Sequence, residues 1–103
     1  TPMRQTIAAR LSESKQTVPH FYLTRSVNCT ALVRLRQETN AGLEKLHAAG
    51  SAAHLPKKVS INDYLIAAVA ATLHDHPAVM RQFRGDHFLQ LANADVGFAV
   101  SLE

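Results

Sequence analysis

Apolar residues recur every four positions at the start of the chain and predict an amphipathic helix. The stripe consists of Met3, Ile7 and Leu11. Polar and charged side chains occupy the other faces, as a helix with one buried face requires. Thr1 suits the N-cap of this helix, and Pro2 suits its first position. Because a proline disfavours the helical conformation in the residue before it, we expect the helix to end near Gln16, ahead of Pro19.

The residue pattern predicts strands in three parts of the chain. Residues 20–29 place Phe21, Leu23, Val27 and Cys29 on one face. Residues 79–83 and 88–91 are separated by a Gly85-Asp86 pair, which suits the two-residue turn of a hairpin. Residues 96–100 alternate between large and small side chains and predict a further strand.

A second helix is predicted after the first of these strands. Its expected buried stripe consists of Leu32, Leu35, Leu43 and Leu46. Asn28 or Thr30 can cap its start, and Gly50 suits its end. Residues 50–58 contain Gly, Ser, Pro and two lysines, so we expect a loop.

The third predicted helix has the clearest start. Ser60 and Asp63 have the spacing of a capping box. Apolar residues then surround nearly the whole segment 64–73, and a helix that is apolar on every side is buried on every side. We therefore expect a central helix, although 103 residues hardly supply enough material to cover it.

Composition is typical of one globular domain or a piece of one, with 47% hydrophobic and 18% charged residues. The net charge of +3 is small and its cations are scattered, which favours a solvated surface over a nucleic-acid arm. Cys29 is the single cysteine, so it forms no intrachain disulfide, and we expect a small core residue there. His74 and His76 point in different directions on a helix, so we expect no metal site. The sequence is typical of a soluble intracellular protein.

Five segments together resemble the catalytic domain of the dihydrolipoamide acyltransferases of 2-oxo acid dehydrogenase complexes. They are residues 2–11 (PMRQTIAARL), 14–21 (SKQTVPHF), 31–36 (ALVRLR), 58–66 (KVSINDYLI) and 95–100 (DVGFAV). Each motif alone is moderately specific, and their order and spacing make the resemblance strong. It implies that residues 1–103 are the N-terminal half of that domain, without a lipoyl or peripheral-subunit-binding domain.

The resemblance implies a fold, an activity and partners. The expected fold is an α/β, two-layer sandwich of the chloramphenicol acetyltransferase type, with a mixed sheet packed by helices. The expected activity is transfer of an acyl group, with acetyl favoured, from a lipoyl-lysine arm to coenzyme A. Implied partners are homotrimers that assemble into cores of twenty-four or sixty subunits, with the decarboxylase and dihydrolipoamide dehydrogenase components. The compartment would be a bacterial cytoplasm or the mitochondrial matrix, with neither nucleic acid nor membrane as a partner.

One departure concerns the catalytic base. The family carries a His-x-x-x-Asp-Gly motif whose histidine accepts the thiol proton, and none of the six histidines here begins such a motif. We therefore assign no catalytic residue and expect the chain to be inactive alone. An alternative is a non-catalytic scaffold subunit of such a complex. A third is an unrelated basic binding module, which would bind duplex DNA tightly but not coenzyme A.

By resemblance, the coenzyme A contacts fall on Arg36, Ser60 and Ser101. A guanidinium makes fork-like, charge-assisted bonds to phosphate, although an exposed helix cation remains open for Arg36. Ser60 lies where free helical N–H groups favour anions, and it can also simply cap its helix. His20, on the polar face of residues 20–29, is implied to line the active-site channel, with a structural role as its alternative.

Overall fold

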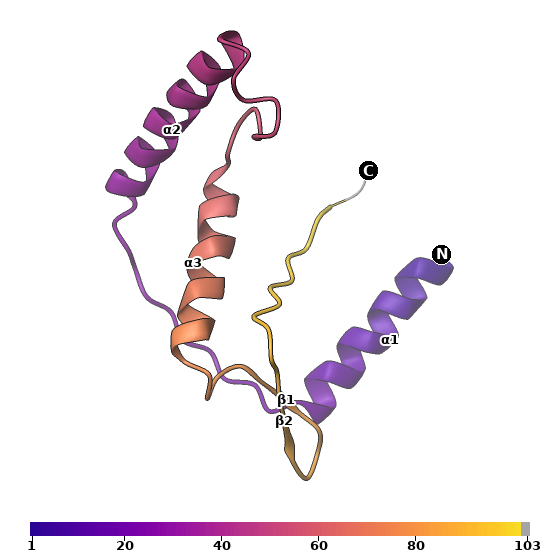
Figure 1. Ribbon diagram of the computed structural model, residues 1–103. Helices are drawn as coiled ribbons and strands as arrows, with labels where there is room; N and C mark the ends of the chain where they lie inside the picture. Colours follow the sequence, from indigo (N-terminus) through magenta and orange to yellow (C-terminus); the bar gives the residue numbers. More distant parts are fainter. Residues whose placement is uncertain (102–103) are drawn as a thin grey trace. The chain divides into compact units, whose positions relative to one another are not determined.

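A computed structural model describes residues 1–101 of the chain. In order, the elements are α1 (Pro2–Thr17), α2 (Thr30–Ala48), α3 (Ile61–Asp75), β1 (Arg81–Phe83) and β2 (Phe88–Gln90) (Figure 1). They fall into two units. One contains Thr1–Ser26 with Arg81–Leu91, and the other contains Val27–Met80 with the segment that begins at Ala92.

In the first unit, α1 forms as the sequence predicts. The Thr1 hydroxyl accepts a hydrogen bond from the Arg4 N–H at 3.4 Å, and Pro2 occupies the first turn. Val18 has an extended conformation, as expected before proline, and ends the helix. The predicted apolar stripe remains open to solvent, since Met3, Ile7 and Leu11 are 64%, 56% and 60% exposed.

The same unit contains the predicted hairpin. β1 and β2 pair antiparallel, with Phe83 opposite Phe88 and their rings 5.9 Å apart. The turn between them holds Gly85 at a φ of +85°, a conformation that costs glycine little. The Arg84 N–H donates to the His87 carbonyl across this turn at 2.9 Å. The Gly85-Asp86 prediction is therefore confirmed.

In the second unit, α2 ends at the glycine that the sequence indicates. Gly50 has a φ of +72°, and its N–H donates to the His47 carbonyl at 3.1 Å. The next N–H, that of Ser51, reaches back to the Leu46 carbonyl at 3.1 Å. These two bonds form a Schellman motif, which satisfies carbonyls that the helix leaves unpaired. At the other end, Asn28 Oδ1 accepts from the Thr30 N–H at 2.9 Å.

Two predicted strands are wrong. Residues 20–29 and 96–100 are not in strands, because neither segment has a paired neighbour among the described residues. Phe21, Tyr22 and Leu23 are 81%, 77% and 87% exposed. Alternating residues fit a strand, but a strand exists only where a second chain segment completes the ladder.

The predicted burial is also corrected in three places. Leu43 is the buried member of the α2 stripe, whereas Leu35 and Leu46 are about half exposed. α3 has no buried residue within the described chain, although its composition predicts burial on every side. Cys29, expected in the core, is exposed at the N-cap of α2. Among residues 1–101, the buried hydrophobic side chains are those of Leu43, Ala52 and Met80, all within the second unit.

The small sheet and the helices agree with an α/β class. Among residues 1–101, no helix combines the length and apolar character that a membrane crossing requires.

Candidate functional site

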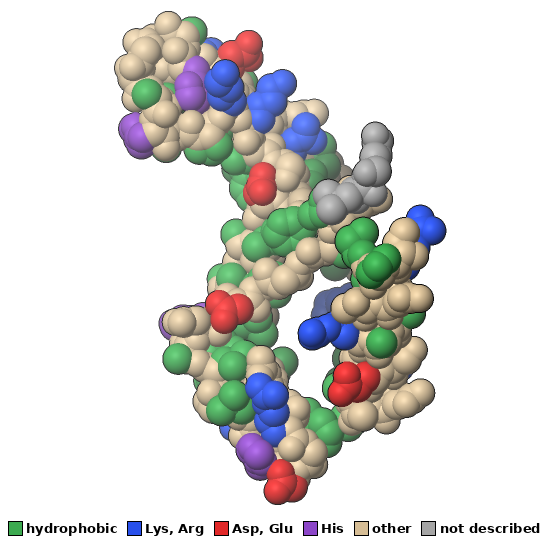
Figure 2. Space-filling model, turned by 90° about the vertical axis from the view of Figure 1, so that its right-hand side faces the viewer, with side chains coloured by type: hydrophobic (Ala, Val, Ile, Leu, Met, Phe, Trp, Pro, Cys, Tyr) green, Lys and Arg blue, Asp and Glu red, His purple; other side chains and the backbone are tan. Residues whose placement is uncertain are grey.

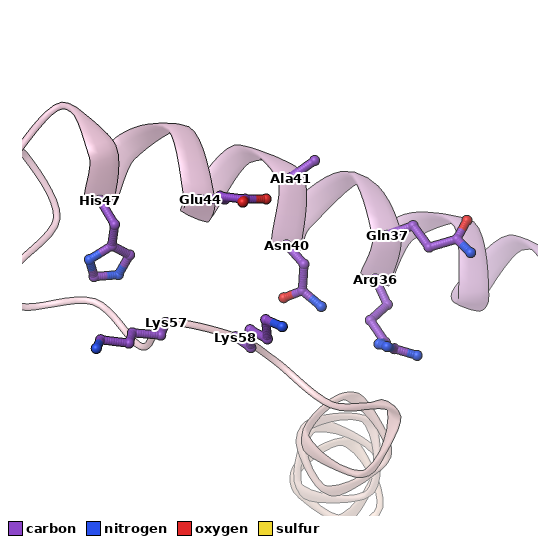
Figure 3. A pocket seen from close by; sticks show the side chains of 8 residues that line it. All are labelled: Arg36, Gln37, Asn40, Ala41, Glu44, His47, Lys57 and Lys58. Atoms are coloured by element: carbon purple, nitrogen blue, oxygen red, sulfur yellow. The ribbon is translucent and has the colours of Figure 1, made fainter.

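The candidate site lies between α2 and the loop that leads to α3. Arg36, Asn40 and His47 fall at helical spacing on one face of α2 and point toward the segment that carries Lys57 and Lys58 (Figure 3). They line a hollow of about 530 Å³, together with Gln37, Ala41 and Glu44. Lys and Arg side chains also lie in a row near the top of Figure 2, at the level of α2 and this loop. The lining contains the cations Arg36, Lys57 and Lys58 and a single carboxylate, that of Glu44, so it carries more positive than negative charge.

A second hollow continues from the first toward the start of α3. Arg36, Asn40 and Lys58 line both hollows, and residues 59–63 complete the second one. Two residues that were predicted to contact coenzyme A, Arg36 and Ser60, thus line one continuous surface. Ser101 lines neither hollow and is exposed.

Arg36 is the most informative side chain of the site. Its Nε is buried and has no hydrogen-bond partner among the described residues. A buried donor without a partner costs roughly 1–3 kcal/mol, more where the group is charged. The neighbouring Arg34 differs, because it is mostly exposed and lies 3.7 Å from Glu38 in an ion pair. An anionic ligand in the hollow would satisfy the Arg36 donor.

Ser60 and Asp63 build the capping box at the start of α3. The Ser60 N–H and hydroxyl both donate to Asp63 Oδ2, at 2.7 and 2.8 Å, and the Asp63 N–H donates to Ser60 Oγ at 3.1 Å. The Ser60 backbone N–H, followed by its hydroxyl, holds the pKa of the Asp63 carboxyl below its ordinary value. The N–H groups of Ile61 and Asn62 have no carbonyl partner inside the helix, so they are the backbone donors that this end offers an anion.

Three side-chain contacts hold the loop and α3 against α2. The Asn40 carboxamide bonds both to the N–H and to the carbonyl of Val59, at 2.8 and 3.0 Å. The Tyr64 hydroxyl donates to Thr39 Oγ1 at 2.8 Å. His47 Nε2 lies 3.2 Å from the Pro56 carbonyl oxygen. The Asn40 and His47 contacts fix the loop wall of the hollow against α2, whereas the Tyr64 contact joins α3 to α2 through two residues that line neither hollow.

Sequence reasoning missed Asn40, His47, Lys57 and Lys58. The positions of Asn40 and His47 relative to Arg36 would have placed all three on one face of α2. The lysine pair is separated from the capping box by Val59 alone, and it precedes a helix start already assigned to anions. No signal in the sequence indicated that this lysine pair packs across the hollow from α2.

His20 belongs to the other unit of the chain. Its Nδ1 lies 2.6 Å from the Val18 carbonyl oxygen, two residues earlier, and the side chain is exposed. Its role in lining a channel stays a prediction. Among residues 1–101, no group of three His, Cys, Asp or Glu side chains is arranged to hold a metal ion.

Comparison with known protein families identifies one family that this chain matches. The profile of the 2-oxoacid dehydrogenases acyltransferase (catalytic domain) family matches residues 1–103. Relatives include the dihydrolipoyllysine-residue acetyltransferase component of the pyruvate dehydrogenase complex of Zymomonas mobilis, 45% identical over 101 residues. The component of the same name from Rhizobium meliloti is 40% identical over 100 residues, and the mitochondrial one from Schizosaccharomyces pombe is 38% identical over 99.

These matches cover nearly all of this chain and a small part of each relative. They span 98%, 97% and 96% of the chain in the order Zymomonas, Rhizobium and Schizosaccharomyces, but 21%, 21% and 18% of the relatives. No solved structure matches the chain significantly. The family match over the whole sequence confirms the resemblance found in the five motifs, and the chain belongs to the acyltransferase catalytic domains of the 2-oxoacid dehydrogenases.

Proposed function

We propose that this chain supplies the coenzyme A side of an acyltransferase core that moves an acetyl group from a lipoyl-lysine arm to coenzyme A. The match of the acyltransferase catalytic domain to residues 1–103 carries this proposal. The relatives are named as acetyltransferase components of the pyruvate dehydrogenase complex, which favours acetyl. The complete domain would have the chloramphenicol acetyltransferase-like fold.

The site supports this role through its binding groups. Coenzyme A carries several phosphate groups, and the hollow offers an unpaired buried guanidinium nitrogen, two lysines and the start of a helix. Arg36 would bind a phosphate by charge-assisted hydrogen bonds, and Lys58 would contribute a point charge. The N–H groups after Ser60 would add donors aligned with the helix dipole. Ser101 remains a proposed contact on the basis of the family motif.

The reaction itself needs a base that this chain does not contain in recognisable form. The sulfur of coenzyme A attacks the thioester carbon and forms a new carbon–sulfur bond, while an imidazole accepts the thiol proton. The resulting oxyanion collapses, breaks the bond to the lipoyl sulfur and returns the proton to that leaving thiol. None of the six histidines begins His-x-x-x-Asp-Gly, so we propose that this imidazole comes from outside the chain, with His20 lining the channel.

Assembly forms part of the proposal. The relatives are components of pyruvate dehydrogenase complexes, so we propose a homotrimer that builds a larger core and meets the decarboxylase and dihydrolipoamide dehydrogenase components. The exposed apolar residues of α1 and α3 favour burial against other chain segments (Figure 2). The proposed compartment is the bacterial cytoplasm or the mitochondrial matrix, where such complexes would work.

An acetyl-transfer assay tests the function. The complete protein that includes this chain is mixed with S-acetyldihydrolipoamide and coenzyme A, and acetyl-coenzyme A is quantified. We expect turnover that saturates with coenzyme A. A core that assembles but shows no transfer and no coenzyme A binding would refute the proposal and favour the scaffold alternative.

A further inference from the structure

Asn40 pairs with the backbone of a single residue in both directions. Its Nδ2 donates to the Val59 carbonyl at 3.0 Å, and the Val59 N–H donates to its Oδ1 at 2.8 Å. Both bonds are partly buried. A carboxamide offers a donor and an acceptor side by side, so it can imitate the pairing of one strand with another. The extended segment before α3 is thereby attached to α2.

The pairing of Asn40 with Val59 affects the distance between the loop groups and Arg36. Val59 lies between Lys58 and Ser60, and Asn40 lies one helical turn beyond Arg36. Arg36, Asn40 and Lys58 line both hollows, and Asn40 stands between the two cations in Figure 3. The bonds between Asn40 and Val59 therefore set how far the loop groups lie from Arg36.

We propose that Asn40 is a positioning residue for the coenzyme A site. It acts through Val59 and holds Lys58 and the first turn of α3 opposite Arg36, at the separation that a bound phosphate requires. The inference rests on the proposed function, because it takes coenzyme A as the ligand of these groups. Without Asn40, the loop cations and the helix start are no longer held in place. Binding of coenzyme A then weakens, whereas binding of the lipoyl substrate is unchanged.

Steady-state kinetics of the complete protein tests this role. Asn40→Ala should raise KM for coenzyme A by about five- to 30-fold, as expected from the loss of one or two kcal/mol of hydrogen bonding. KM for S-acetyldihydrolipoamide should stay unchanged, and so should kcat at saturating coenzyme A. A purely structural role would instead lower kcat through loss of folded enzyme and leave KM for coenzyme A at the wild-type value.

Two further variants separate positioning from general loosening. Tyr64→Phe removes the 2.8 Å bond to Thr39, which also joins α3 to α2, and should leave KM for coenzyme A unchanged. Asn40→Asp keeps the size of the side chain and the acceptor for the Val59 N–H. This variant should therefore fold even if Asn40→Ala does not. Its carboxylate faces the Val59 carbonyl and an incoming phosphate, so KM for coenzyme A should rise at least as much as in Asn40→Ala.

If both Asn40 variants keep the wild-type KM for coenzyme A, the inference is overturned. Acetyl transfer by the wild-type protein would still support the proposed function in that case. The inference would also be overturned if Tyr64→Phe raised KM for coenzyme A as much as the Asn40 variants do. A wild-type protein that neither transfers acetyl nor binds coenzyme A would remove the proposed function itself.

Discussion

Ser60 and Asp63 exchange hydrogen bonds in both directions at the first turn of α3, and their side chains together fix where the helix begins. Replacing Ser60 with Ala removes the hydroxyl that accepts from the Asp63 N–H. The free energy of unfolding should therefore fall by about 0.5–2 kcal/mol. Ser60→Thr retains a hydroxyl and should stay close to wild type. Urea unfolding of the complete protein, followed by circular dichroism, measures both, and equal midpoints for Ser60→Ala and wild type would exclude the capping role.

The lowered pKa of Asp63 predicts how stability depends on pH. The folded-state pKa lies below the unfolded-state value of about 3.9, so the carboxylate stabilises the fold fully above that value. This contribution is lost as pH falls through the folded-state pKa. Asp63→Asn keeps an acceptor but does not titrate, so its stability should depend less steeply on pH than wild type below about pH 4. Urea midpoints measured at a series of acidic pH values test this, and parallel curves would contradict it.

Arg36 should contribute directly to coenzyme A affinity. Because a charged hydrogen bond contributes about 1.5–3 kcal/mol, Arg36→Ala should weaken binding by that amount. Arg34→Ala is the matched control, since Arg34 lies on the same helix in an exposed pair with Glu38 and should change affinity little. Isothermal titration of the complete protein with coenzyme A gives both dissociation constants. Equal constants for Arg36→Ala and wild type would remove Arg36 from the site.

Replacing a glycine with alanine should change the stability of the protein in opposite directions at Gly42, inside α2, and at Gly50, just after its end. Gly50 has a φ of +72°, so Gly50→Ala places a side chain in a left-handed conformation and should destabilise the protein by about 1–2 kcal/mol. Gly42 lies inside the helix, and an added Cβ would meet no atom within 4 Å beyond its chain neighbours and the helix backbone, so Gly42→Ala should stabilise by about 0.5–1 kcal/mol. Thermal unfolding distinguishes the two variants. A stabilising Gly50→Ala would show that the Schellman motif does not hold the end of α2.

Local signals in the sequence predicted the ends of the helices and the hairpin turn. Thr1, the Ser60–Asp63 pair and Gly50 act on residues within a few positions, so their effect can be derived from the chain itself. Gly85 is similar, because the turn conformation needs only the residues beside it. Arg36 and Ser60 came from the family motif, and they line one surface.

The errors concern features that depend on distant or additional segments. Residues 20–29 alternate like a strand, but no described segment pairs with them. The apolar faces of α3 indicate burial, yet Leu65 and Val69 remain nearly half exposed. Asn40 was missed for the same reason, since its bonds to Val59 join residues 19 positions apart. Periodicity shows which faces need a partner and does not identify the partner.

A structure of the complete protein with coenzyme A bound is the most direct test of the central claim. The unpaired Nε of Arg36 should lie within about 2.7–3.2 Å of a phosphate oxygen, with Lys58 and the N–H groups after Ser60 facing the same ligand. Coenzyme A bound with its phosphates elsewhere, and Arg36 Nε satisfied by a protein carbonyl or carboxylate, would contradict the assignment.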